Sequence, residues 1–297
     1  PNGTIVIPDS MDLVAKVDIN GPAYKANLKL REGQGTIDMD AALNTLTEVY
    51  KADLKINNLQ LHNFLPKDSI YELSLSADAE GRGLDVMSYR SFAKLNLSLD
   101  QLHYAQYHLS NVDLTGALKG ALVTANLTSD NALLKMTTDA EYNLAHRYPD
   151  GKVTVDVTQL DLHELGLMPQ PMKRPLAFNL SAEARQNRVF THLTSGDMKL
   201  NLSARSGVEP LIRQSTHFVD VLMRQIDEKA LDHAELREAL PTAILSFSAG
   251  KENPLAYFLA TQNISYQDAS MKFGTAPDWG INGKAAIHTL KVDTLQL

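Results

Sequence analysis

The sequence predicts a mainly β protein: an elongated, curled antiparallel-type repeat sheet with an inserted α-helical segment. Apolar and polar residues alternate over many short runs, and this period of two indicates half-buried strands. Turn-forming groups such as Asn20-Gly21-Pro22 and Pro149-Asp150-Gly151 separate the runs. Their spacing of about 10–15 residues favours a meander, sandwich or solenoid over a parallel α/β sheet. A short apolar phrase also recurs four times along the chain.

Alternating runs predict strands through the first half of the chain and again near its end. The predicted strands are 4–7, 13–19, 24–30, 36–41, 50–56, 70–79, 92–99, 107–114, 117–127, 133–144, 153–157, 264–266, 269–273 and 284–290. Most of their apolar residues are Leu, Ile, Val and Ala, and leucine is not the strongest strand former. We therefore expect packing, more than intrinsic propensity, to decide the structure.

The recurring phrase places apolar residues at steps of two, three and two. Its copies are Leu54, Ile56, Leu59 and Leu61; Leu97, Leu99, Leu102 and Tyr104; Val155, Val157, Leu160 and Leu162; and Leu290, Val292, Leu295 and Leu297. A step of two keeps a side chain on one sheet face, whereas a step of three moves it to the other face. Both pairs of a copy share a face only if an extra residue bulges out or the strand bends. We expect a sheet that kinks at each copy and curls into a trough, with the Leu, Ile and Val residues of the phrase as its lining.

The composition changes near residue 207. From 208 to 228, Leu211, Phe218, Leu222 and Ile226 fall at spacings of three and four, which predicts one face of an amphipathic helix. This helix has three interpretations: it packs on the sheet, it covers an apolar groove as a lid, or it lies on a membrane surface. Its polar face mixes both charges, which argues against the membrane surface.

Two further helix starts follow. Asp232, with Glu235 three residues on, predicts a capping box for a helix that ends before Pro241. Asn253 followed by Pro254 predicts a short helix that ends near residue 261. The chain is thus predicted to have three regions: a curled β-repeat region at 1–206, a helical insert of about three helices at 207–262, and a continuation of the β-repeat at 263–297.

Whole-chain composition limits the function classes. The 297 residues are 44% hydrophobic and 21% charged, which is typical of a folded protein. A formal net charge of −7 argues against nucleic acid as a partner, because phosphate binding needs clustered Lys and Arg. The lack of cysteine excludes disulfides, thiolate zinc sites and a Cys nucleophile. The sequence begins at Pro1 without Met or a signal peptide, so we expect a fragment whose targeting segment or anchor lies outside it.

The residue patterns predict no catalytic, cofactor-binding or metal-binding residue, and hence no enzyme. His103 and His108 are five residues apart in a β region, so we expect them on opposite faces and unable to share a metal. His62 and His163 occupy the same place in two copies of the phrase, which indicates a structural position. The triplet 129–131, Ser-Asp-Asn, matches part of the β-lactamase signature, but no Ser-x-x-Lys motif accompanies it.

Three stretches resemble the AsmA/TamB superfamily. Residues 52–66 and 153–167 are similar to its recurring phrase, in which a strand runs into Leu-x-Leu and a short helical turn. Residues 253–266 are similar to another stretch, where a short helix delivers the next strand. The combination looks most like TamB-like translocation and assembly module proteins of the Bacteroidetes type.

That resemblance implies a periplasmic segment of a protein anchored in the inner membrane by a helix outside this fragment. Its sheet would form a half-pipe, or β-taco, whose apolar groove shields phospholipid or other acyl chains during transport towards the outer membrane. A barrel partner of the BamA/TamA type would be expected in the outer membrane. One alternative is a structural or chaperone scaffold that assists outer-membrane protein assembly by strand pairing. Another is a glycan-processing β-repeat enzyme, for which no carboxylates can be nominated.

Overall fold

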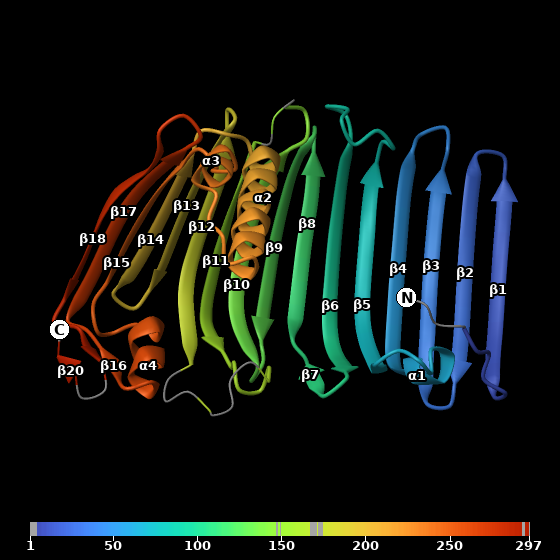
Figure 1. The fold of residues 1–297 in the computed structure, drawn as a ribbon. Helices are drawn as coiled ribbons and strands as arrows, with labels where there is room; N and C mark the ends of the chain where they lie inside the picture. The colour runs from blue at the N-terminus through green and yellow to red at the C-terminus, as the bar shows by residue number, and fades with distance from the viewer. Residues whose placement is uncertain are drawn as a thin grey trace. The chain divides into compact units, whose positions relative to one another are not determined.

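A computed structural model describes residues 5–146, 148, 150–166, 171, 175–292 and 295–296. With 58% strand and 14% helix, it confirms the predicted mainly β class. Seventeen strands belong to one antiparallel sheet, and three short strands form a second (Figure 1). The chain divides into two compact units, Pro1–Ala145 with Val157–Leu176, and His146–Asp156 with Ala177–Leu297, called here the first and second unit.

The first unit is an antiparallel meander. Its strands are β1 (Met11–Asn20), β2 (Ala23–Glu32), β3 (Gly35–Asn44), β4 (Val49–Gln60), β5 (Ile70–Arg82), β6 (Phe92–Tyr104), β7 (Tyr107–Leu109), β8 (Val112–Lys119), β9 (Leu122–Asp130) and β10 (Leu134–Asn143), with a one-turn helix α1 (Leu61–Phe64) after β4. Each long strand pairs with its neighbours in chain order, and both β7 and β8 pair with β6. Tight turns between consecutive alternating runs explain this order.

Three strand predictions in this unit are wrong in part. Residues 5–7 are not in a strand. The predicted strand 117–127 is the hairpin of β8 and β9, whose turn places Gly120 and Ala121 at φ of 57° and 65°. The predicted strand 107–114 is divided into β7 and β8 around Asn111, which also has a positive φ, 52°. Short turns formed by Ala or Asn carry little composition signal, because such residues also occur within strands.

The second unit contains a second antiparallel series. Its strands are β12 (Leu176–Arg185), β13 (Arg188–Ser195), β14 (Met198–Ala204), β15 (Ala243–Ala249), β17 (Asp268–Ala276) and β18 (Gly280–His288), paired in that order. Strand β11 (Gly151–Leu160) contributes residues to both units. The small sheet consists of β16 (Ile264–Ser265), β19 (Lys291–Val292) and β20 (Leu295–Gln296).

The helices begin where the sequence predicts. They are α2 (Val208–Asp227), α3 (His233–Glu238) and α4 (Pro254–Thr261). The Asp232 side chain accepts from the backbone N–H of Ala234 and Glu235, which confirms it as an N-cap. The rest of the capping-box prediction is wrong, because the Glu235 carboxylate does not accept from the backbone N–H of Asp232. It accepts from the side chains of Arg224 and Gln225 in α2. The predicted helical insert also contains β15, a strand of the main sheet that the sequence reading missed.

Helix α2 packs its first turns on the sheet of the second unit. Val189, Ala204 and Leu211 form a buried cluster, against which Val208 and Ala243 also pack. This contact favours the first of the three interpretations of the helix. The predicted buried stripe is wrong at its end: Ile226 is 52% exposed, while Val221 and Gln225 are buried where α2 meets α3.

A polar cluster fixes the start of α4. Asn253 is fully buried, and its side-chain oxygen accepts from Ala256 N–H at 2.9 Å. Its Nδ2 donates to Asp197 Oδ1 at 2.7 Å, and the backbone N–H groups of Gly250 and Glu252 also donate to that carboxylate. Desolvation raises the pKa of Asp197, but the hydrogen bonds from Asn253, Glu252 and Gly250 outweigh it, so the pKa lies below its ordinary value.

Candidate functional site

The sheet of the first unit separates apolar from polar side chains. Strand registers align the apolar residues in rows that run across the strands. One row is Leu13, Leu30, Ile37, Ile56, Leu75, Leu99, Val112, Ser129 and Met136, and the next is Ala15, Leu28, Met39, Leu54, Ala77, Leu97, Leu114, Leu127 and Thr138. A third row is Val17, Ala26, Ala41, Ala52, Ala79, Leu95, Gly116, Ala125 and Ala140, and a fourth is Ile19, Tyr24, Leu43, Tyr50, Gly81, Ala93, Leu118, Val123 and Tyr142. These four rows are called the apolar face.

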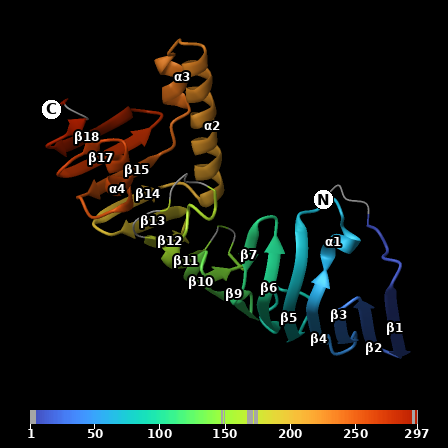
Figure 2. The ribbon, with the colours of Figure 1, turned by 90° about the horizontal axis from the view of Figure 1, so that it is seen from below.

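The apolar face has no second layer along most of its length in the part of the chain that the structure describes. Leu13, Val17 and Ile19 are 51%, 67% and 65% exposed, and Leu95 in the middle of the sheet is 38% exposed. Figure 2 shows β1–β9 as a single layer of strands. Among the leucines of the phrase whose burial the structure describes, Leu59, two residues before α1, is the one that is fully enclosed, at 2% exposed. A large exposed apolar surface is typical of a binding surface.

The first phrase lies on this face because of a bulge. Ile56 pairs with Leu75 and Leu59 pairs with Leu73, with a register shift between them. Since Leu73 and Leu75 are two residues apart on β5, Ile56 and Leu59 share a face, as predicted for a step of three that contains a bulge. Asn58 bulges out at φ 45°, and its N–H donates to Ser74 Oγ at 2.8 Å.

The second phrase behaves in the same way. Leu99 pairs with Leu75 and Leu102 with Leu73, so β6 holds one extra residue around Asp100. Seven leucines of the two phrases and their partners on β5 are half-buried: Leu54, Leu61, Leu73, Leu75, Leu97, Leu99 and Leu102. Leu54 and Leu97 lie in one cross-strand row with Ala77 between them. The structure therefore places the strand residues of the first two phrases on one face, where both predicted bulges are confirmed.

The third and fourth phrases are placed differently. Val155 and Val157 lie in β11, where Val157 is buried, and Leu160 and Leu162 are half-buried at its end. The fourth copy does not continue a strand of the main sheet, because β18 ends at His288. Leu290 precedes β19, Val292 pairs with Ile264 in the small sheet, Leu295 lies in β20, and Leu297 lies outside the described residues.

The sequence reading missed a row of small residues on the apolar face. Seven of the nine residues in the third row are Ala or Gly, and the flanking rows are mostly Leu, Met or Tyr. The small residues run without a break from Ala26 to Ala79, and Leu95 separates this run from Gly116 and the alanines of β9 and β10. Tyr50 borders the row and lies over Gly81, where a Cβ would come within 2.4 Å of the Tyr50 Oη. The missed signal was alanine at matching positions of successive strands.

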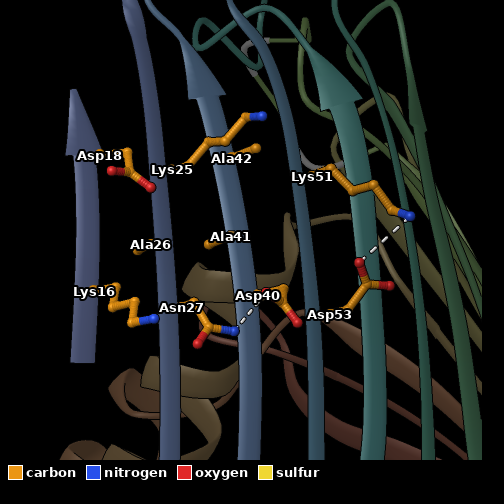
Figure 3. Close-up of a pocket in the computed structure, with 10 residues that line it drawn as sticks. All are labelled: Lys16, Asp18, Lys25, Ala26, Asn27, Asp40, Ala41, Ala42, Lys51 and Asp53. Carbon is orange, nitrogen blue, oxygen red and sulfur yellow. Dashed lines mark hydrogen bonds and ion pairs between the residues drawn. The ribbon is translucent and has the colours of Figure 1, made fainter. Parts of the chain in front are cut away.

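The opposite face of this unit is polar. One of its rows is Lys16, Asn27, Asp40, Asp53, Asp78, Asn96, Thr115, Asn126 and Asp139. A shallow depression of about 470 Å³ lies over β1–β4, with Asn27 donating to Asp40 at 2.8 Å and Lys51 paired with Asp53 at 3.4 Å (Figure 3). Among the described residues, no three His, Cys, Asp or Glu side chains are arranged to hold a metal ion.

The histidine prediction is wrong for one pair. A two-residue turn at Ala105 and Gln106 folds β7 back on β6, so His103 and His108 are direct cross-strand partners. Their rings stack with centroids 4.0 Å apart, and Tyr71 lies 4.9 Å from His103. The separation of five residues counts through the turn and not along one strand, which is why the parity argument fails.

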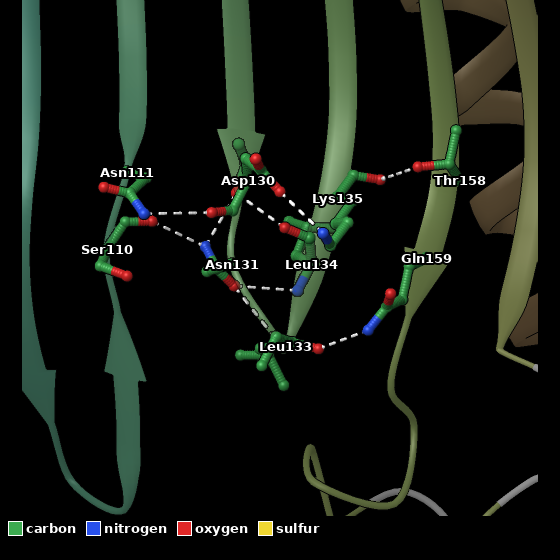
Figure 4. Close-up of polar contacts among 11 residues, drawn as sticks. Ser110, Asn111, Asp130, Asn131, Leu133, Leu134, Lys135, Thr158 and Gln159 are labelled. Carbon is green, nitrogen blue, oxygen red and sulfur yellow. Dashed lines mark hydrogen bonds and ion pairs between the residues drawn. The ribbon is translucent and has the colours of Figure 1, made fainter.

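The Ser-Asp-Asn triplet has a structural role at the turn from β9 to β10 (Figure 4). The Asn131 side chain accepts from Leu134 N–H at 2.9 Å and donates to the Ser110 carbonyl at 2.9 Å. Ser129 Oγ donates to the Leu134 carbonyl at 3.0 Å. These contacts satisfy buried polar groups where three strands meet, so the triplet needs no catalytic explanation.

Comparison with known proteins gives no match to a family model, to a curated protein or to a solved structure. Across the described residues, no helix combines the length and the apolar character that crossing a membrane requires.

Proposed function

We propose that the apolar face of the first unit holds the acyl chains of a phospholipid or another lipid. The chain would be a periplasmic segment of a TamB/AsmA-like envelope protein, anchored in the inner membrane, that shields lipids on their way to the outer membrane. The observation that carries this proposal is the exposed apolar face, which extends over nine strands. A curled sheet would wrap this face around the lipid.

The energetics support an acyl ligand. Each CH₂ group kept out of water is worth about 0.8 kcal/mol, so exposing two acyl chains during transfer costs on the order of 20 kcal/mol. A continuous aliphatic surface lowers that barrier for the lipid, and the lipid covers the exposed leucines in return. The run of small residues from Ala26 to Ala79 gives an extended acyl chain space across β2–β5, while the headgroup stays in water at an open side.

Two adjacent alanines on β3 allow a matched test. Ala41 lies in the row of small residues, and Ala42 points to the polar face. Each would be replaced by Glu, and the proteins purified from a Gram-negative host would be examined by native mass spectrometry. Wild type and Ala42→Glu are expected to carry copurified lipid, and Ala41→Glu at least tenfold less. Equal lipid content in the two variants, with unchanged circular dichroism, would refute the proposal.

The edge strand β1 favours a second candidate, a scaffold that assists outer-membrane protein assembly by strand pairing. In the described chain β1 pairs only with β2, and its ten residues contain no proline. Such an edge can add a strand from a client or from a barrel partner of the BamA/TamA type. Amide exchange in β1 should slow when an unfolded outer-membrane barrel protein is added. Unchanged exchange in β1 would exclude this function.

A further inference from the structure

One face of the sheet in the second unit, called here its polar face, consists mainly of polar side chains but carries three large apolar side chains that are exposed. They are Phe190, which is 45% exposed, Ile244, which is 46% exposed, and Trp279, which is 53% exposed. These three side chains, two of them aromatic, are called here the aromatic strip. Phe190 and Ile244 lie in one cross-strand row, with the small Ser203 between them. The neighbouring row on this face contains no apolar residue; it consists of Ser181, His192, Asn201, Ser246, Lys272 and Lys284.

The indole of Trp279 completes the strip. Gly274 pairs with Ile244, so any side chain at 274 would stand beside Ile244 on the same face. A Cβ on Gly274 would lie 2.8 Å from Trp279 Cη2, which shows that the indole fills this place. Phe190 and Gly274 are separated by three strand spacings, or about 14–15 Å.

Hydrogen bonds connect the side chains of the polar row beside the aromatic strip. His192 Nδ1 and Asn201 Oδ1 are 2.5 Å apart, and Asn201 Nδ2 donates to Ser246 Oγ at 3.4 Å. Together with Phe190, Ile244 and Glu183, whose carboxylate pairs with Arg185 at 3.2 Å, these residues line a shallow depression of about 350 Å³. Aromatic side chains beside a few fixed polar groups are the usual lining of a small-molecule site.

The polar row ends in two adjacent lysines, Lys272 and Lys284, which could bind an anion. Lys272 and Lys284 are direct cross-strand partners, and like charges in this position destabilise a sheet. Within the described residues, no ion pair to a carboxylate relieves either ammonium group. A ligand carboxylate between them would remove the repulsion.

We propose that this surface binds a linear acidic oligosaccharide that runs across the strands. A pyranose has an apolar face of C–H groups, which stacks on the negative face of an aromatic ring, and a rim of hydroxyl groups, which suits Asn201 and Ser246. A 1,4-linked chain advances by about one strand spacing per sugar, so two rings three apart in the chain reach Phe190 and Trp279, and the two rings between them lie over Ser203 and Ile244. The acidic groups face Lys272 and Lys284. The site is separate from the lipid surface and does not rest on the proposed lipid function.

The test uses Trp279, the only tryptophan of the chain, as a reporter. Titration with hexagalacturonic acid should change its fluorescence in a saturable way, with much weaker binding of neutral cellohexaose. Phe190→Ala should raise the Kd at least tenfold. Lys272→Gln should raise the Kd about fivefold and reduce the preference for the acidic sugar. Tyr89→Ala, which removes an aromatic residue that is 77% exposed in the first unit, should change nothing.

Two results would overturn the inference. One is emission that stays constant up to millimolar hexagalacturonic acid, together with no heat of binding in calorimetry. The other is binding of poly-glutamate as tight as that of the sugar, because the site would then recognise negative charge alone. Loss of calorimetric binding in Trp279→Ala, with the thermal melt unchanged, would support the stacking contact.

Discussion

The two units use the same alternating strands but treat their apolar faces differently. In the second unit α2 covers part of the sheet, and Val189, Ala204 and Leu211 become a buried cluster. In the first unit the rows around Leu54 remain a single layer, with Val17 67% exposed. Period-two patterning therefore states which side is apolar, but not what covers it. An apolar face that a helix covers stabilises the protein, whereas an apolar face without a second layer is available to a ligand.

The largest expected effect contrasts one leucine from each unit. Leu211→Ala should lower the free energy of unfolding of the second unit by about 2–4 kcal/mol, because it leaves a cavity in a packed cluster. Leu54→Ala should cost only about 1 kcal/mol in lipid-free protein, since water fills the space. Urea denaturation followed by hydrogen exchange of each unit measures both values. Equal losses would mean that the two faces are equally buried.

A glycine pair locates the part of the first unit that is tightly packed. A Cβ on Gly35 would lie 2.9 Å from the Leu59 Cα at the bulge, whereas the nearest atom to one on Gly116 is 3.8 Å away. Gly35→Ala should therefore cost about 1–3 kcal/mol through overpacking. Gly116→Ala should be neutral or stabilise by a few tenths of a kcal/mol. A neutral Gly35→Ala in thermal melts would contradict the bulge geometry.

The smallest expected effect is a pH dependence confined to the second unit. The folded pKa of Asp197 lies below its ordinary value of 3.8, so its carboxylate stabilises the folded state above that pH. This contribution is lost as the pH falls below 3.8 and through the folded pKa. Asp197→Asn should lower the melting temperature near pH 7 and flatten its decline on acidification. If wild type and variant lost stability in parallel between pH 5 and 2.5, the hydrogen bonds to Asp197 would not be responsible.

The sequence predicted local features, such as bulges and helix starts, better than it predicted which apolar surfaces a second layer covers. The step of three between Ile56 and Leu59 predicted a bulge, and Asp232 and Asn253 predicted helix starts, because each signal lies within a few residues. The turn at Ala105 was missed because it contains neither glycine nor proline. Strands β12–β15 were not predicted, although Leu245 and Phe247 of β15 alternate with Ser246 and Ser248, because the helix signals on both sides of β15 were taken to extend through it. Whether a second layer covers the leucines depends on contacts between distant segments, which one sequence does not specify.

The most direct test of the account is photo-crosslinking at neighbouring positions of β3. A benzophenone amino acid would replace Ala41 on the apolar face or Ala42 on the polar face, in cells of a Gram-negative host. We predict lipid adducts, detected by mass spectrometry after ultraviolet illumination, at position 41 and at least tenfold fewer at position 42. Equal adducts at both positions, or none at position 41, would contradict the claim that the apolar face of the first unit carries lipid.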